Sequence, residues 1–221
     1  TLTMSTKYII PMFIDQADLS QQSYLDAMKI ADFQGKKTSE RIEVAVLAEH
    51  ASWTNFGVTD LAGGAADDAA TITVSATNID DIIRAVKRKV YANNGVEFAV
   101  EKGFFFVWRP ADFELLEGFT QASGFSTADL ALKNGIPVGM HYMGADHYIT
   151  NDNVANHVFC GVKKMGDLGI LSGTFGQVKF IEDPANADGS LSGLGIVSRV
   201  DLGFSWPTYN VQFFIDLNVA S

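Results

Sequence analysis

The sequence has one cysteine and fewer basic than acidic residues, and both shortages exclude classes of protein. Cys160 stands alone among 221 residues, which excludes an intramolecular disulfide and argues against a disulfide-dense secreted scaffold. Lysine and arginine number 16 against 26 acidic residues, which gives a net charge of −10. A general nucleic-acid binder needs clustered basic side chains to displace counterions from phosphates, so this class is disfavoured.

Targeting and membrane segments are also missing from the printed sequence. No apolar run approaches the ~20 residues needed to cross a bilayer. Residues 1–13 lack the basic region followed by an apolar region that marks a secretion signal. We therefore expect a protein that does not span a membrane, is not exported by that route and folds in a reducing cytoplasm.

Motifs for nucleotide chemistry and nucleophilic catalysis are absent from the sequence. It contains neither a G-x-x-x-x-G-K-[ST] loop nor a G-x-G-x-x-G turn between a strand and a helix. There is no G-x-S-x-G elbow, and Cys160 lies in the apolar stretch VFCGV, where a thiol is usually an inert core residue. We expect no catalytic residue and no cofactor-binding residue.

One cluster, HYMGADH, resembles a metal site. It brings His141, Asp146 and His147 close together in sequence, although without a regular ligand spacing. A metal-dependent enzyme that uses these three residues is one hypothesis. An exposed loop histidine is the more common role of such a residue, so we expect no metal ligand here.

Four basic residues form the densest positive cluster, and they lie towards the end of a predicted helix. The cluster comprises Arg84, Lys87, Arg88 and Lys89. Positive charge at that end complements the helix dipole, so a structural role is favoured over nucleic-acid binding.

The early part of the chain predicts one long helix. A stripe that is apolar at both ends and polar or small in its middle recurs at alternating steps of three and four, which is a helical period: Leu25, Met28, Asp32, Gly35, Ser39, Ile42, Val46, Glu49, Trp53 and Phe56. A helix from Ser20 to about Asn55 would be about 50 Å long. Two alternatives remain open: a break at Gly35, and a strand over residues 41–47, where Ile42, Val44 and Val46 alternate.

Other segments show local patterns of strands and short helices. Asn78 precedes a helix with one apolar face, which ends at Asn94-Gly95. The apolar run Gly103 to Arg109 predicts a central buried strand that leads through Pro110 into a short helix. The remaining predictions are an edge strand at 6–14, a short strand at 71–75, a short helix that Ser126 and Asp129 cap, and strands at 136–143, 157–163, 174–182, 195–204 and 211–217. Together these predict an α+β fold.

The order of these elements resembles the major capsid proteins of tailed bacteriophages, the Hong Kong 97-type shell fold. The resemblance rests on IDDIIRAVKRKV, then FFFVWRPADFELL, then LKNGIPVGMHYMG, and on the closing stretch LGIVSRVDLGFSWPTYNVQFF. It implies a long spine helix, a peripheral sheet and an axial α/β domain. The implied regions are a return strand of the extended loop at 1–18, a peripheral-type region at 19–100, an axial-type domain at 101–190 and closing strands at 191–221.

This resemblance also implies a function without catalysis. The expected protein assembles with copies of itself, in pentamers and hexamers, into an icosahedral virion capsid around double-stranded DNA. Assembly would take place in the cytoplasm of the bacterial host, with scaffolding, portal and decoration proteins as further partners and without sequence-specific DNA contacts or a membrane. An encapsulin-like compartment shell is the close alternative, and a phage tail or other virion part is another.

The family usually carries an N-terminal arm and the outgoing half of the extended loop ahead of the residues seen here. The printed sequence lacks these pieces, so Thr1 need not be the true beginning: cleavage during maturation, an arm outside the printed sequence or a shortened chain would each give the same start. No covalent cross-link is inferred, because the loop that provides one in some relatives is not part of the sequence.

Overall fold

The structure is a computed structural model that describes residues 6–15, 24–64, 67–122, 139–171, 177–182, 192–207 and 212–220. The chain divides into two compact units. Unit 1 comprises Thr1–Val46 and Leu168–Ser205, and unit 2 comprises Leu47–Asp167 and Trp206–Ser221. Among the described helices, none is both long enough and apolar enough to span a bilayer.

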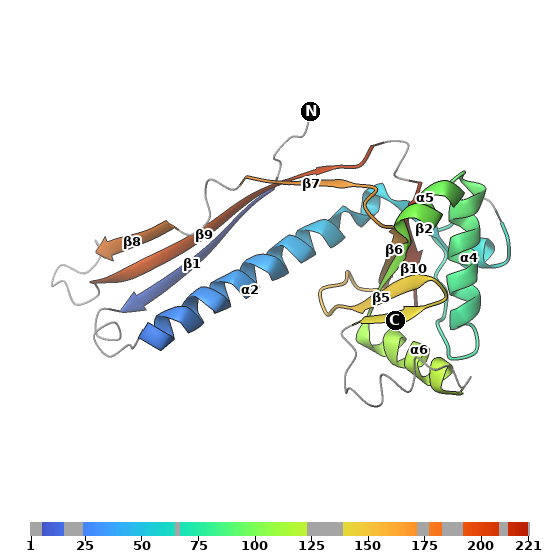
Figure 1. Cartoon of the computed structure of the whole chain (residues 1–221), viewed down its shortest axis with the longest axis horizontal. Coiled ribbons are helices and arrows are strands. Elements are labelled where there is room, and N and C mark those ends of the chain that lie inside the picture. The colour runs from blue at the N-terminus through green and yellow to red at the C-terminus, as the bar shows by residue number, and fades with distance from the viewer. Residues whose placement is uncertain are drawn as a thin grey trace. The chain divides into compact units, whose positions relative to one another are not determined.

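Unit 1 contains a sheet and the long helix α2 (Tyr24–Ala48), which runs beside it (Figure 1). Strands β1 (Thr6–Asp15) and β9 (Ser192–Ser205) pair antiparallel along the whole of β1. The strands β7 (Asp167–Ile170) and β8 (Gln177–Glu182) also belong to this sheet, in which β1 is an edge strand of the order β1-β9-β7. The edge position explains how β1 accommodates Pro11, which cannot donate a ladder hydrogen bond.

The long helix is confirmed, although its predicted end is wrong. It continues through Gly35 and over residues 41–47, so neither the break nor the strand alternative holds. After Ala48 the chain forms the short helix η1 (Glu49–Ser52) and the strand β2 (Thr54–Phe56). Ile42 and Ala45 pack with Val200, Leu202 and neighbouring residues, which buries one face of the helix against the sheet of unit 1. Trp53 and Phe56 instead enter the core of unit 2, and this packing overrides the helical period at the end of the stripe.

Unit 2 is built on a six-stranded sheet in the order β2-β10-β6-β3-β5-β4. Its other strands are β3 (Phe104–Trp108), β4 (Gly139–Tyr142), β5 (Ala145–Ile149), β6 (His157–Val162) and β10 (Phe214–Asn218). The helices of this unit are α3 (Val58–Leu61), α4 (Ile79–Ala92), α5 (Val96–Lys102) and α6 (Pro110–Ala122) (Figure 1). As predicted, β3 is an inner strand, and it lies between β6 and β5.

Helix α4 follows its sequence pattern closely. The five apolar residues expected on one face are all fully buried in the core of unit 2: Ile79, Ile82, Ile83, Val86 and Val90. Asn94 has the predicted left-handed backbone, with φ of 61°. Asn78 precedes the helix as expected, but its side-chain oxygen accepts from the Ser75 backbone N–H instead of capping the helix.

Several expectations need correction or lie outside the described residues. Residues 71–75 contribute an isolated parallel bridge between Ile72 and Val219 instead of a strand. The short elements α5, β5 and β7 were not predicted, since each is too short to establish a period. The helix expected near Ser126 and Asp129 falls outside the described residues.

Candidate functional site

The sequence-based metal hypothesis centres on the hairpin of β4 and β5. His141 and Asp146 are direct cross-strand partners, and His141 Nδ1 lies 2.7 Å from Asp146 Oδ1. Lys163 pairs with the other carboxylate oxygen of Asp146. The hydrogen bonds from Lys163 and then from His141 hold the pKa of Asp146 below its ordinary value. This part of the cluster is an exposed charge network around one carboxylate.

His147 does not join that network. It follows Asp146 on the same strand, and successive strand residues point to opposite faces of a sheet. Its side chain is fully buried, with Nδ1 accepting from Trp108 Nε1 at 2.9 Å and Nε2 donating to the Tyr142 carbonyl at 3.1 Å. Both ring nitrogens are therefore in use, and the structure does not bring together the three residues of the alternative metal hypothesis.

Burial has a measurable consequence for His147. Loss of hydration disfavours the charged ring and lowers the pKa to about 4 from the usual 6.5. Protonation of Nδ1 would also set two N–H donors against each other at the Trp108 contact. Because the unfolded chain takes up this proton near pH 6.5 and the folded chain near pH 4, stability falls as the pH decreases through this window.

Because of His147, we expect the free energy of unfolding to fall by about 2 kcal/mol between pH 7.5 and pH 5. The measurement is urea unfolding of the wild type and of His147→Gln at both pH values. The variant should lose about 2 kcal/mol less over this interval, because it lacks the buried imidazole. Equal losses would contradict the assignment of a neutral, buried His147.

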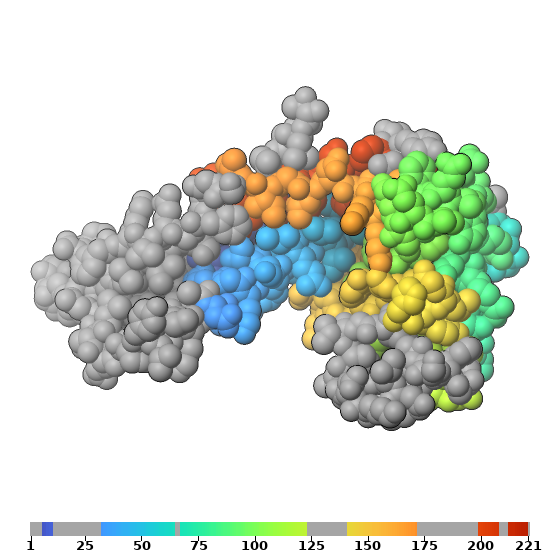
Figure 2. Space-filling model, viewed as in Figure 1, coloured from blue at the N-terminus to red at the C-terminus, as the bar shows by residue number. Residues whose placement is uncertain are grey.

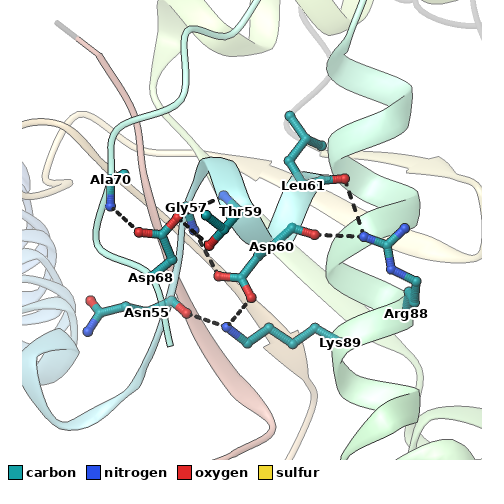
Figure 3. Close-up of polar contacts among 9 residues, drawn as sticks. All are labelled: Asn55, Gly57, Thr59, Asp60, Leu61, Asp68, Ala70, Arg88 and Lys89. Carbon is teal, nitrogen blue, oxygen red and sulfur yellow. Dashed lines mark hydrogen bonds and ion pairs between the residues drawn. The ribbon is translucent and has the colours of Figure 1, made fainter. Parts of the chain in front are cut away.

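The basic residues of α4 are held in structural contacts, as the sequence analysis favoured, although dipole compensation is not their main role. Lys89 Nζ lies 2.8 Å from Asp60 Oδ1 and donates to the Asn55 carbonyl at 2.6 Å (Figure 3). Arg88 donates to the backbone carbonyls of Asp60 and Leu61. These contacts fasten residues 55–61 to α4, and we call them the Asp60 clamp.

Asp60 is the centre of this clamp. Its side chain is 1% exposed, and its second carboxylate oxygen accepts from the Gly57 backbone N–H at 3.1 Å. Close by, Asp68 accepts from the backbone N–H and hydroxyl of Thr59 and from the Ala70 backbone N–H (Figure 3). These hydrogen bonds, led by the Thr59 backbone contact, lower the pKa of Asp68. Residues 55–61 and 68–70 are therefore held in place by two carboxylates with structural roles.

The two other basic residues of α4 also have local partners. Arg84 pairs with Asp80 and Asp81 one turn earlier. The ammonium of Lys87 lies over the Phe104 ring, 5.3 Å from its centre, and desolvation lowers its pKa. None of the four residues of the basic cluster is thus left as a free charge for binding phosphate.

Cys160 is the inert core thiol that the sequence predicted. It is fully buried in β6, and burial raises its pKa well above the ordinary value, with the Asp216 charge as a second cause. A thiol in this state is a poor nucleophile.

A second polar cluster in unit 2 was missed from the sequence. His50 Nδ1 lies 2.9 Å from one carboxylate oxygen of Asp216, and His157 Nδ1 lies 2.7 Å from the other. The sequence offered one signal, because Asp216 interrupts the apolar strand FFIDLN, and a charge in a buried strand needs a partner. The identity of those partners depends on tertiary structure.

Unit 2 also exposes apolar side chains that a monomer would normally bury. Val96 and Val100 lie one helical turn apart on α5 and are 49% and 80% exposed. Tyr148 on β5 is 44% exposed. Figure 2 shows that α5 (green) and the β4–β5 hairpin (yellow) both form part of the surface in this view. Exposed apolar side chains grouped on one element are typical of surfaces that contact other chains.

The chain has the α+β fold of tailed-bacteriophage capsid proteins, as its likeness to solved structures shows. A structure from Mycobacterium phage Che8 matches 98% of this chain and 72% of its own, with a TM-score of 0.63 and 16% identity. The mature capsid of bacteriophage PhiM1 matches 100% of this chain and 72% of its own, with a TM-score of 0.58 and 14% identity. A virus-like particle from Pyrococcus furiosus matches 96% of this chain and 75% of its own, with a TM-score of 0.55 and 10% identity.

Sequence comparison adds nothing to this result, since neither a family model nor a curated protein matches the chain. The likeness therefore concerns the fold, and it confirms the fold class that the order of elements implied.

Proposed function

We propose that this chain is a major capsid protein that assembles with copies of itself into the icosahedral shell of a tailed bacteriophage. The observation that carries the proposal is the match of 98% of the chain to Mycobacterium phage Che8 and of 100% to the mature PhiM1 capsid. The shell would enclose double-stranded DNA, and the protein would serve as a structural component without catalysis. Its location would be the virion capsid, after assembly in the cytoplasm of the host.

The properties of the described surface support this function. Exposed apolar residues such as Val100 and Leu168 would become buried between subunits, which is the main driving force of stable association. The net charge of −10 would limit non-specific adhesion to packaged DNA. Pentamers and hexamers are the proposed assemblies, with scaffolding, portal and decoration proteins as further partners. We also propose that residues 101–190 form the axial-type domain of the shell subunit.

An encapsulin-like compartment shell is the second candidate, because a virus-like particle from Pyrococcus furiosus shares the fold. The two functions differ in what the shell contains. A phage capsid encloses DNA and carries a tail, whereas a compartment holds protein cargo.

Sedimentation and electron microscopy of the purified chain test the proposal. We expect megadalton particles, and particles isolated from the source should contain nuclease-protected DNA. Tailless particles filled with protein would favour the compartment shell. A chain that stays monomeric at high concentration, even when a scaffolding partner is supplied, would refute both shell functions.

A further inference from the structure

Three polar side chains of unit 2 converge in a cluster that the proposed shell function does not use. They are His50 in η1, His157 in β6 and Asp216 in β10. One potential ligand atom from each lies within 4.8 Å of the other two. The imidazole rings of His50 and His157 approach each other with their centres 4.5 Å apart.

The charge of Asp216 is incompletely balanced by the protein. Its side chain is 2% exposed, and the two histidines are its ionic partners among the described residues. Neither lysine nor arginine in that part of the chain forms an ion pair with it. A buried carboxylate without a permanent positive partner is costly, and a bound divalent cation would supply that charge.

The surroundings of the cluster also suit a cation. The side chains of His50 and His157 are each 21% exposed, which leaves a route from solvent to the buried carboxylate. Asn218 is the cross-strand partner of His157, and its buried Nδ2 has no hydrogen-bond partner among the described residues. Such an amide could donate a hydrogen bond to a water molecule in the outer hydration shell of an ion. The ring of the fully buried Phe159 lies parallel to that of His157, with the two centres 6.4 Å apart.

We propose that His50, His157 and Asp216 bind one divalent transition-metal ion. Two imidazoles and one carboxylate form a ligand set that suits Zn²⁺ and neighbouring ions such as Co²⁺ and Cu²⁺. The Nδ1–oxygen separations of 2.9 and 2.7 Å would need to open only slightly to surround an ion with ligands at about 2.0–2.1 Å. The ion would join η1 to the β6–β10 pair and would act as a structural link within unit 2.

Calorimetric titration of the metal-free full chain, purified without a histidine tag, tests this inference with Zn²⁺ alone. We expect one ion per chain. The melting temperature should rise by roughly 5–10 °C at free Zn²⁺ a hundredfold above the dissociation constant. The variants His50→Gln and His157→Gln retain an amide that can hydrogen-bond to Asp216, and each should bind Zn²⁺ at least about tenfold more weakly. The matched control His141→Gln changes an exposed histidine that also contacts a carboxylate, and it should bind normally.

A second measurement needs no variant. Cu²⁺ added to the unmodified chain should give an electron paramagnetic resonance spectrum with hyperfine coupling to two imidazole nitrogens. The absence of saturable Zn²⁺ binding would overturn the proposal, and so would undiminished binding by both glutamine variants. In that case the two histidines would only hydrogen-bond to Asp216 and would not bind a metal ion. Either result leaves the shell function unaffected, because particle formation is measured separately.

Discussion

Replacement of Asp60 by asparagine is expected to reduce the free energy of unfolding by about 3–5 kcal/mol. The carboxylate is 1% exposed and serves two donors, Lys89 through one oxygen and the Gly57 backbone N–H through the other. An amide has one acceptor oxygen, so either Gly57 would face an N–H₂ group or Lys89 would lose its carboxylate partner and retain the neutral Asn55 carbonyl. The Lys89 side chain is 10% exposed, so loss of the Asp60 charge would leave its largely buried ammonium less well compensated.

Thermal unfolding measures this effect, and the melting temperature should fall by about 6–12 °C. The matched control is Asp81→Asn on α4. Its ion pair with Arg84 has side chains that are 61% and 58% exposed, and such pairs contribute at most about 1 kcal/mol. In the double variant Asp60→Asn, Lys89→Met, the loss should be smaller than the sum of the two single losses. If Asp60→Asn proved as mild as the control, the Asp60 clamp would have no energetic importance.

Substitution of Gly161 by alanine should also be severely destabilising, because the backbone of Phe213 and Phe214 leaves no room for a Cβ atom on β6 at this point. A Cβ atom on Gly161 would lie 2.3 Å from the Phe213 carbonyl oxygen and 3.1 Å from Phe214 Cα. Both atoms are backbone, so no side-chain rotation can relieve the contact. The strands would have to separate and weaken the adjacent hydrogen bond from Val162 N to the Phe213 carbonyl.

We expect Gly161→Ala to cost about 3 kcal/mol or more, or to abolish folding at 37 °C. Denaturant unfolding measures the loss, with Gly118→Ala as the control. Gly118 lies in α6, where an added Cβ meets no atom within 4 Å, so alanine there should stabilise by about 0.5–1 kcal/mol. Near-normal stability of Gly161→Ala would mean that the two strands lie farther apart than described.

Both substitutions also bear on shell formation. Asp60 and Gly161 are buried in unit 2, so neither residue is available for contact with another subunit of the proposed shell. A loss of particles in either variant should therefore follow the loss of folded chain, and soluble folded protein that fails to assemble is not expected.

The sequence predicted those elements whose pattern repeats over several turns or is bounded by clear chain signals. Helix α4 is the best case, because its buried face is periodic and Asn94-Gly95 ends it. Strand β3 was equally clear, since a short continuous apolar run that stops before Pro110 is typical of a buried strand. The end of α2 was misplaced because Trp53 and Phe56 fit the helical period by spacing, although they pack in the core of unit 2.

The polar sites were less predictable, because chain proximity does not determine which face of a strand a residue occupies. His141, Asp146 and His147 are neighbours in sequence, yet the alternation of β5 buries His147 against Trp108 and leaves Asp146 with Lys163. Sequence alone determined that the chain has an α+β fold, an inert thiol and no recognisable catalytic motif. Tertiary structure decided that His50 and His157, which lie 166 and 59 residues from Asp216, converge on its carboxylate. Strand pairing creates such contacts between distant residues, and no local pattern records them.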